Sequence, residues 1–352
     1  MYDQMVISSS RKKYVVNFCE LTNDLIKNLA NNSFLVIDSN VDKFYPHFRN
    51  IFDEEKIFIV ESTEKNKSMP YCYHMIGQLI ERGIKRNHRL VAVGGGVVQD
   101  ITGFVASILY RGVDWVFLPT TLLAQADSCI GSKTSINIGD IKNLVGTFYP
   151  PNEIYCCSQF RNTLGEEDIK SGIGEILHYY LIDNNEKIYE LMEHYEDLFK
   201  NRSKITSHIY ESLAIKKRMI VKDEFDENER KIFNYGHTFG HAIEALSQNE
   251  VPHGQAVTLG MDIANFVALK LGYIEQPTYN RMHELLVKNF PDYKMKEEHL
   301  DLYMKILSKD KKNIDDSIVC ILPHSFGDMR VEALNNKRKV RQAIQKYIEL
   351  YK

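Results

Sequence analysis

The sequence predicts an α/β N-terminal domain with a mostly parallel sheet, followed by an all-α C-terminal domain. Over roughly the first 160 residues, short β-branched runs alternate with helical stretches, which is typical of a parallel sheet covered on both faces. After Pro150 and Pro151, amphipathic helices follow one another with hardly a strand candidate. A length of 352 residues fits about two domains. We therefore expect a nucleotide-binding type of domain over 1–160 and a helical domain over 161–352.

The elements of the first domain follow from residue patterns. A helix is expected where Cys72, Ile76, Leu79 and Ile80 recur at helical spacing, and a buried helix over Val97–Leu109. The predicted strands are short and rich in branched residues, and they are Phe34–Ile37, Ile57–Val60, Leu90–Val93, Trp115–Leu118 and Ile154–Cys156.

The second domain shows the 3.6-residue apolar period through most of its length. A short β signal at Ser317–Leu322 precedes a last helix near Lys337–Leu350. The remaining predicted helices are Ile169–Ile182, Glu186–Phe199, Ile205–Val221, Thr238–Leu246 and Ala256–Leu271.

Composition excludes several classes of protein. The net charge is −3, from 44 Lys plus Arg against 47 Asp plus Glu, so no global positive field is available to hold nucleic acid or an anionic membrane. No apolar run approaches the 18 or more residues of a membrane span, and the first residues lack the layout of a secretory signal. We expect a cytoplasmic protein whose six cysteines are free thiols.

A glycine-rich turn follows the strand predicted at Leu90–Val93. Gly94, Gly95 and Gly96 lack side chains, so backbone N–H groups at the start of the next helix could approach a pyrophosphate. The pattern is not GxGxxG, and a purely structural turn is the alternative. Asp38, at the end of the first strand, could accept hydrogen bonds from a ribose or could cap a helix.

Polar residues are concentrated in the roughly 25 residues from Pro119 to Asn143. The segments Pro119–Ser128, Gly131–Ser135 and Lys142–Asn143 hold hydroxyls, one acid and two lysines between small residues. These polar groups cannot all be buried in a core. They indicate either a ligand-binding loop or a capped loop between a strand and a helix.

Histidines in the helical half are spaced like metal ligands. His237 and His241 are four residues apart and so share one helix face, and His253 follows. Glu175 is the best candidate for a carboxylate ligand, because it lies in an otherwise apolar helix. Two imidazoles and a carboxylate would leave a position open on a catalytic ion, whereas a pair of solvated or core histidines is the alternative. Thr238 after the first histidine excludes the zinc-protease motif.

Several basic and amide residues flank this histidine cluster. Each is compatible with a solvated surface charge. Together they could line a pocket for a substrate that carries both carboxylate and phosphate. They are Lys133, Lys216, Arg230, Asn234 and Lys311.

The chain resembles the 3-dehydroquinate synthase family and its sugar-phosphate cyclase relatives from about residue 33 to residue 328. Nine motifs occur in order and with compatible spacing: GGGVVQD, FVASILYRG, LPTTLLAQADS, GSKTSIN, KNLVGTFYPP, GEILHYYLI, KDEFDENER, NYGHTFGHAIE and PHGQAV.

The resemblance implies specific roles for matching residues. Glu175, His237 and His253 would hold Zn²⁺ or Co²⁺, and His241 would face the substrate phosphate. Arg111 would reach across a homodimer interface into the partner's site. Substrate contacts would come from Asp127, Lys133, Asn143, Lys216, Arg230, Asn234 and Lys311. The NAD site would be lined by Asp38, Glu64, Lys67, Gly95, Gly96, Asp100, Thr120, Thr121, Lys142, Phe160 and Thr163.

The resemblance also implies a reaction. Transient oxidation of a secondary alcohol by NAD makes the neighbouring C–H acidic and so allows phosphate to leave; reduction, ring opening and aldol closure then give a carbocycle. The GHTFGHAIE motif and the Lys216 and Arg230 clamp favour 3-deoxy-D-arabino-heptulosonate 7-phosphate as substrate and 3-dehydroquinate as product.

The chain departs from the family at several positions. His178 stands where the family has Lys, in the expected pocket; Gln99, Ser132 and Ser135 replace glycines, and Ile138-Gly139 stands where His-Pro is common. His178 leaves open a paralogous cyclase of the 2-deoxy-scyllo-inosose, valiolone or aminodehydroquinate type. The sequence is also compatible with a net oxidoreductase resembling glycerol dehydrogenase and with a non-catalytic binding protein.

Overall fold

A computed structural model describes residues 4–139, 141–309, 313 and 317–351. The chain forms two compact units. The first runs up to Gly165 and also takes in Ile209–Phe225, and the second comprises Glu166–His208 and the chain from Asp226 onward. Ile209–Phe225 belongs to the first unit because Ser212 Oγ and Lys216 Nζ both hydrogen-bond to backbone carbonyls of the 124–128 segment, at 2.8 Å each.

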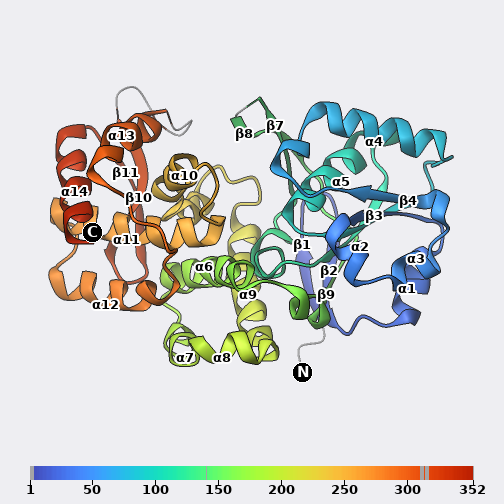
Figure 1. The fold of residues 1–352 in the computed structure, drawn as a ribbon, viewed down its shortest axis with the longest axis horizontal. Helices are drawn as coiled ribbons and strands as arrows, with labels where there is room; N and C mark the ends of the chain where they lie inside the picture. Colours follow the sequence, from blue (N-terminus) through green and yellow to red (C-terminus); the bar gives the residue numbers. More distant parts are fainter. Residues whose placement is uncertain (1–3, 140, 310–312, 314–316, 352) are drawn as a thin grey trace. The chain divides into compact units, whose positions relative to one another are not determined.

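The first unit is built on a seven-stranded sheet in the order β1-β2-β9-β6-β5-β3-β4 (Figure 1). Only the β1–β2 pair is antiparallel among these pairings. The five predicted strands are confirmed, and β1 and β2, which no prediction covered, extend one edge of the sheet. The bounds are β1 Gln4–Ser8, β2 Lys13–Cys19, β3 Ser33–Asp38, β4 Ile57–Val60, β5 Arg89–Gly94, β6 Asp114–Pro119 and β9 Glu153–Cys157.

Helices cover both faces of this sheet. Consecutive side chains of a strand point to opposite sides, so each strand can pack against a helix on either face. On one face, Val116 of β6 joins a buried cluster with Ile26 of α1 (Asn23–Ala30) and Phe48 of α3 (His47–Ile51). The neighbouring Trp115 points to the other face, where its ring lies against Gly103 of α5 (Gly96–Ile108). The other helices of this part are α2 (Ser39–Phe44) and α4 (Met69–Glu81).

A separate hairpin stands where the sequence indicated only a polar loop. Strands β7 (Lys133–Ile138) and β8 (Ile141–Phe148) pair antiparallel. The strands were not predicted because polar residues interrupt both of them. The close pairing requires Gly146, since a Cβ there would lie 1.9 Å from the Thr134 carbonyl oxygen.

The second unit is helical, as predicted, with one added hairpin. The predicted helix at Glu186–Phe199 is wrong as a single helix, because His194 ends α7 (Lys187–Glu193) before α8 (Tyr195–Lys200) begins. The β signal is confirmed as β10 (Ile318–Ser325), which pairs with an unpredicted β11 (Asp328–Leu334). The other helices are α6 Glu166–Asp183, α10 His237–Leu246, α11 His253–Leu271, α12 Gln276–Leu286, α13 Leu300–Ser308 and α14 Lys337–Leu350, and α9 (Ile205–Lys222) connects the units.

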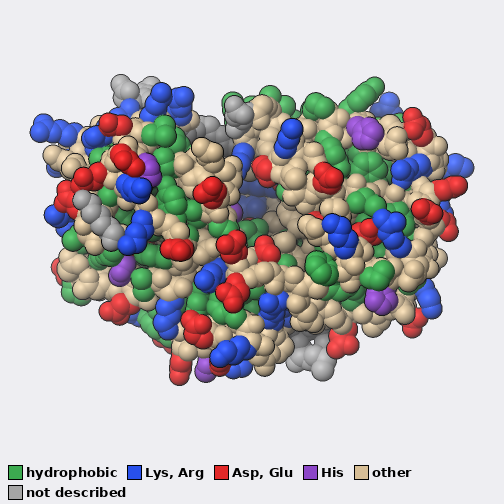
Figure 2. All heavy atoms as spheres, viewed as in Figure 1, with side chains coloured by type: hydrophobic (Ala, Val, Ile, Leu, Met, Phe, Trp, Pro, Cys, Tyr) green, Lys and Arg blue, Asp and Glu red, His purple; other side chains and the backbone are tan. Residues whose placement is uncertain are grey.

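The distribution of surface charge and the state of the cysteines agree with what the composition predicted. On the face drawn in Figure 2, basic and acidic side chains are interspersed within each unit. Among the described residues, no helix combines the length and apolarity that crossing a membrane would take. All six cysteines are free, as predicted.

Candidate functional site

Three predicted metal ligands come together in the second unit. Glu175 of α6, His237 at the start of α10 and His253 at the start of α11 place one ligand atom each within 4.8 Å of one another. The Glu175 Oε1 atom lies 3.6 Å from His237 Nε2 and 3.2 Å from His253 Nε2. Ligand atoms about 2.0–2.2 Å from one tetrahedral ion lie roughly 3.3 Å apart, so these spacings fit a shared ion.

Glycines let the three helices approach closely enough to form this triplet. A Cβ on Gly174 would lie 2.0 Å from the Gly254 carbonyl oxygen, and a Cβ on Gly254 would lie 1.7 Å from the Ser171 carbonyl oxygen. A Cβ on Gly260 would likewise lie 2.2 Å from the carbonyl oxygen of Gly236, the left-handed residue that precedes α10. Side chains at these crossings would therefore separate the helices that carry the ligands.

Hydrogen bonds at the far nitrogens orient both imidazoles. His237 Nδ1 lies 3.2 Å from the Tyr235 carbonyl oxygen, and His253 Nδ1 lies 3.2 Å from Glu244 Oε2. Because carbonyl and carboxylate oxygens only accept, each Nδ1 donates to its partner, which leaves the Nε2 that faces Glu175 as the atom able to bind an ion. Such outer partners are typical of metal-bound histidines. Sequence reasoning missed both partners, although Glu244 lies on the same helix as His237.

The Glu175 carboxylate is suited to an ion and poorly placed without one. Its side chain is buried, and Oε1 makes no hydrogen bond of normal geometry among the described residues. Burial by itself would raise the pKa of this carboxyl, but the imidazoles of His237, His253 and His178 lower it well below its ordinary value. A buried, ionised carboxylate that faces the Nε2 atoms of two imidazoles fits a divalent cation.

The two other histidines of the prediction lie beside this triplet. His178, one turn after Glu175, is 1% exposed, and its Nδ1 lies 3.7 Å from Glu175 Oε2. Its ring contacts the rings of Tyr235 and His237 at centroid distances of 6.2 and 5.0 Å. His241 is exposed, and its Nε2 lies 3.9 Å from Glu244 Oε2. The geometry thus groups His237 with His253 and Glu175, and it groups His241 with His253 and Glu244.

The glycine-rich turn joins β5 to α5 in the first unit. A Cβ on Gly94 would lie 2.5 Å from the Val98 side chain, and a Cβ on Gly95 would lie 2.8 Å from Thr121 Cγ2. Gly96 opens α5 with nothing within 4 Å of its Cβ position. The first two glycines therefore serve packing, whereas Gly96 leaves room at the N-terminus of a buried 13-residue helix.

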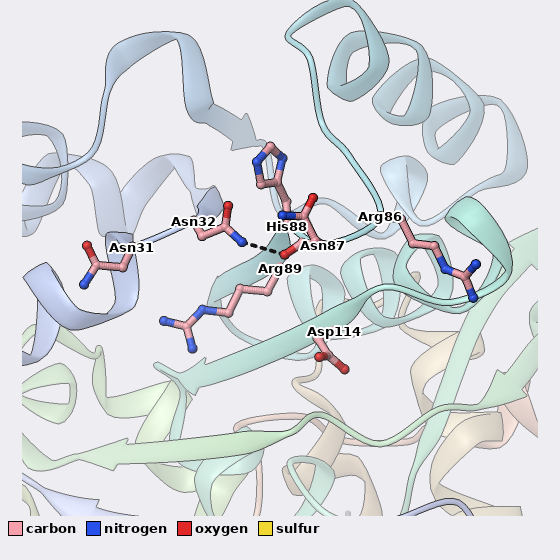
Figure 3. Close-up of a pocket in the computed structure, with 7 residues that line it drawn as sticks. All are labelled: Asn31, Asn32, Arg86, Asn87, His88, Arg89 and Asp114. Carbon is pink, nitrogen blue, oxygen red and sulfur yellow. Dashed lines mark hydrogen bonds between the residues drawn. The ribbon is translucent and has the colours of Figure 1, made fainter.

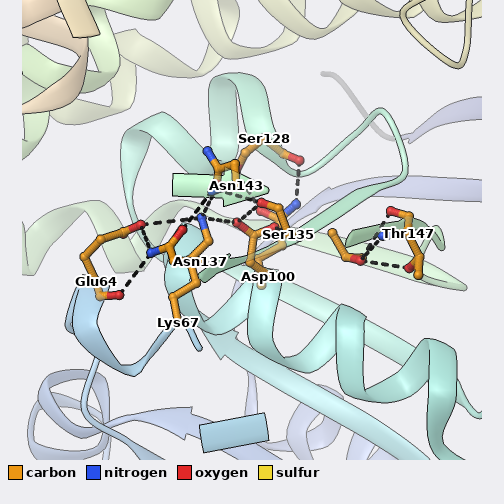
Figure 4. Close-up of polar contacts among 10 residues, drawn as sticks. Glu64, Lys67, Asp100, Ser128, Ser135, Asn137, Asn143 and Thr147 are labelled. Carbon is orange, nitrogen blue, oxygen red and sulfur yellow. Dashed lines mark hydrogen bonds and ion pairs between the residues drawn. The ribbon is translucent and has the colours of Figure 1, made fainter. Parts of the chain in front are cut away.

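Three predicted NAD residues form one polar cluster with Asn143 (Figure 4). Lys67 Nζ lies 2.6 Å from Asp100 Oδ2, 2.6 Å from Asn143 Oδ1 and 3.8 Å from Glu64 Oε1. Burial raises the pKa of the Asp100 carboxyl, although Lys67 opposes the shift. The cluster also contains two residues to which sequence reasoning gave no specific role, Ser135, which donates to Asp100, and Asn137, which donates to Glu64.

Other predicted NAD residues have structural partners. Asp38 caps α2, accepting from Asn40 N at 2.6 Å, which was the alternative expected for it. The Thr120 N–H donates to the Gly94 carbonyl oxygen, and Thr121 Oγ1 accepts from Ala124 N. The ring of Phe160 is buried in the sheet core, Thr163 Oγ1 donates to the Phe160 carbonyl oxygen, and Lys142 is exposed on β8.

The predicted substrate residues are distributed over both units. In the first, Lys216 Nζ pairs with Asp127 Oδ1 at 2.7 Å, and Lys133 is exposed at the start of β7. In the second, Arg230 is buried and Asn234 Nδ2 donates to the Lys231 carbonyl oxygen. Arg111 is exposed and, like Tyr110 before it, has a positive φ, of 64°. Lys311 lies outside the described residues.

A polar pocket lies at the opposite, amino-terminal edge of the sheet (Figure 3). The Asn32 side chain donates to the Asn87 carbonyl oxygen there at 2.6 Å. None of the predicted site residues lines this pocket, whose lining is Asn31, Asn32, Arg86, Asn87, His88, Arg89 and Asp114.

A parallel-sheet domain with a glycine-rich helix start, together with a His₂–carboxylate triplet whose carboxylate is buried, is typical of enzymes that combine a dinucleotide with a divalent ion. Comparison with known families agrees. Residues 57–171 match the 3-dehydroquinate synthase N-terminal model, and residues 172–313 match the 3-dehydroquinate synthase C-terminal model. The chain therefore belongs to the 3-dehydroquinate synthase family.

Curated relatives support the same membership. The chain is 36% identical to the 3-dehydroquinate synthase of Clostridium tetani over 320 residues, which cover 90% of this chain and 85% of that protein. It is 37% identical to the 3-dehydroquinate synthase of Dictyoglomus turgidum over 337 residues, which cover 94% of each.

Solved structures share the fold. A 2-epi-5-epi-valiolone synthase from Streptomyces hygroscopicus, solved with NAD⁺ and Zn²⁺, superposes with a TM-score of 0.85 at 23% identity, covering 98% of this chain and 99% of that one. A 2-deoxy-scyllo-inosose synthase, solved with carbaglucose-6-phosphate, NAD⁺ and Co²⁺, gives 0.83 at 22% identity, covering 97% and 99%. The glycerol dehydrogenase of Schizosaccharomyces pombe gives only 0.57 at 15% identity, covering 95% and 90%.

Proposed function

We propose that this protein is an NAD- and divalent-metal-dependent cyclase that converts 3-deoxy-D-arabino-heptulosonate 7-phosphate to 3-dehydroquinate and phosphate, a carbon–oxygen lyase reaction. The observation that carries the proposal is the Glu175, His237 and His253 triplet, in a chain that both halves of the family model match. When bound, NAD⁺ supplies a reversible hydride acceptor, and Zn²⁺ or Co²⁺ supplies a Lewis acid.

The chain's own residues would bind and orient the dinucleotide and the ion. Glu175, His237 and His253 would hold the ion through Oε1 and the two Nε2 atoms. The open N-terminus of α5 at Gly96 would receive the pyrophosphate. The cluster of Glu64, Lys67 and Asp100, with the other NAD residues that the family resemblance implies, would line the rest of the dinucleotide site.

The substrate would be held by charge. Lys216 would meet the substrate carboxylate together with Arg230, and the Asp127 carboxylate at 2.7 Å fixes the direction of the lysine ammonium. His241, exposed and outside the ligand triplet, would meet the phosphate. Lys133, Asn143, Asn234 and Lys311 would complete the contacts. The phosphate oxygens themselves can take the α-proton, so these residues need only orient the phosphate over that carbon.

His178 favours a second candidate, a paralogous cyclase that acts on another sugar phosphate. A lysine at this position would carry a fixed cation, whereas this imidazole is buried among aromatic rings with Nδ1 3.7 Å from Glu175 Oε2. Such a site would hold different substrate hydroxyls from those that a lysine would meet.

A substrate panel separates the candidates. Purified protein is supplied with NAD⁺ and Co²⁺ or Zn²⁺ and is assayed for phosphate release from the heptulosonate phosphate, hexose phosphates, heptulose phosphates and amino-sugar phosphates. We expect release from the heptulosonate phosphate without net NADH. Release from another sugar alone would favour the paralogous cyclase, accumulation of NADH would favour a polyol dehydrogenase, and NAD⁺ binding without any turnover would favour a binding protein.

We also propose that the protein acts as a homodimer in which Arg111 reaches the partner's site. The exposure of Arg111 supports this assignment, because its side chain is accessible to a second subunit. Sedimentation of the purified protein tests the dimer, and mixed dimers of Arg111→Ala and Glu175→Ala subunits test the shared residue. The cytoplasmic location stays a prediction from the sequence.

A further inference from the structure

Two cysteines lie side by side at the carboxyl end of the sheet in the first unit. Cys19 is the last residue of β2 and Cys157 is the last residue of β9, and the two are directly paired in the parallel register. Their Sγ atoms are 3.7 Å apart. The proposed reaction uses neither thiol.

The backbone at this pair permits a disulfide. Neighbouring strands lie about 4.7–4.9 Å apart, which falls within the Cα separation of about 4.4–6.8 Å that disulfides span. The sulfurs would have to move together from 3.7 Å to about 2.05 Å. Rotation about the Cα–Cβ bonds can supply much of this closure, so neither strand has to leave the sheet.

The two thiols differ in reactivity. Cys19 is partly exposed, whereas Cys157 is completely buried. The hydrogen bond between them lowers the pKa of Cys19, and the same bond, with burial, raises the pKa of Cys157 well above its ordinary value. The accessible sulfur therefore has the greater thiolate character, and the buried sulfur keeps its proton next to it.

We propose that Cys19 and Cys157 form an oxidation site that closes to a reversible disulfide when the protein meets a peroxide. The Cys19 thiolate attacks one peroxide oxygen, the O–O bond breaks, and a sulfenic acid and hydroxide result. The Cys157 sulfur then attacks the Cys19 sulfur; the S–S bond forms, and the sulfenic hydroxyl leaves as water with the Cys157 proton. Two thiols lose two electrons, and one hydrogen peroxide becomes two water molecules.

The disulfide would act on the segment that follows β9. The Cys157 carbonyl oxygen accepts from Gln125 Nε2 at 3.1 Å, and Gln125 Oε1 accepts from Arg161 at 2.9 Å. Ser158–Thr163, which begins at this point, carries Phe160 and Thr163 of the NAD site. We expect the cross-link to weaken NAD⁺ binding, and this consequence rests on the proposed function.

The test treats the purified protein with hydrogen peroxide and maps its thiols by mass spectrometry after alkylation. The expected result is loss of two of the six free thiols, a Cys19–Cys157 linked peptide and full recovery with dithiothreitol. Cys19→Ser should abolish the link. Cys157→Ala should leave a Cys19 sulfenic acid that dimedone traps, which keeps the test decisive if the first variant does not fold.

The matched control is Cys72→Ser, since Cys72 is a buried thiol whose pKa burial raises to about 12. This variant should form the link as the unchanged protein does. Unaltered thiols, a link between other cysteines, or oxidation of Cys19 alone in the unchanged protein would overturn the proposal. NAD⁺ affinity that is equal in the reduced and cross-linked forms would overturn only the expected effect on binding, and a reduced protein without NAD⁺ affinity would count against the proposed function.

Discussion

Replacing Gly254 by alanine should dismantle the metal centre without touching a ligand atom. Gly254 follows the proposed metal ligand His253 at the start of α11, where this helix crosses α6. The Gly254 N–H donates to Ser171 Oγ at 3.0 Å, and the Gly254 carbonyl oxygen lies 2.0 Å from the Cβ position of Gly174. The two backbones are therefore in direct contact next to Glu175 and His253, two of the proposed metal ligands.

The size of the effect follows from these contacts. The added Cβ would lie 1.7 Å from the Ser171 carbonyl oxygen, and since such contacts essentially never fall below 3.0 Å, the helices must separate by at least about 1.3 Å. Metal–ligand distances tolerate only about 0.2 Å. Altering a partner outside the ligand sphere already costs about 10–100-fold in metal affinity. We expect a loss of at least about 100-fold, with about 1–3 kcal/mol of destabilisation from overpacking.

Competition with a chelating indicator measures the Zn²⁺ and Co²⁺ affinities of the folded protein, and far-ultraviolet circular dichroism checks the fold. The matched control is Gly77→Ala in α4, where the Cβ position has nothing within 4 Å. This control should keep its metal affinity and gain about 0.5–1 kcal/mol, because alanine suits a helix interior better than glycine. A Gly254→Ala protein that binds metal as tightly as the control would refute the reasoning.

Three other predictions concern the second unit. Glu244→Gln removes the charge behind His253 and should weaken Zn²⁺ binding by about tenfold in the same competition assay; unchanged affinity would exclude this supporting role. The hydrogen bond to Asp262 raises the pKa of His283, so its stabilising charge is fully present below about pH 6.5 and is lost as pH rises through the raised value. The unchanged protein should therefore have a higher thermal midpoint than His283→Gln, and this difference should shrink with rising pH. A difference that stays constant with pH would contradict a stabilising charge on His283. His178→Lys should leave the fold intact and alter turnover or sugar preference, whereas identical kinetics across the panel would show that the position is inert.

The pattern of apolar residues was enough to predict the central strands and most helices. Strands such as Leu90–Val93 are buried on both faces, so they read as short apolar runs. Helices such as Lys337–Leu350 bury residues at helical spacing over several turns, so their apolar period shows in the sequence. The hairpin β7–β8 was not predictable in this way, because its strands lie outside the seven-stranded sheet and carry polar residues on exposed faces. The break at His194 was missed because the apolar period continues across it.

For the candidate site, too, the sequence predicted one part and the tertiary structure decided the other. The sequence by itself determined which groups can bind a metal, since His237, His241, His253 and a carboxylate in an apolar helix offer the needed chemistry. The tertiary structure decided which atoms face one another, because Glu175 and His253 are distant in the chain and meet only where glycines let two helices touch. It also decided that Tyr235 and Glu244 hold the imidazoles through Nδ1. Residue type is a local property, whereas the distance between two side chains depends on how every intervening residue packs.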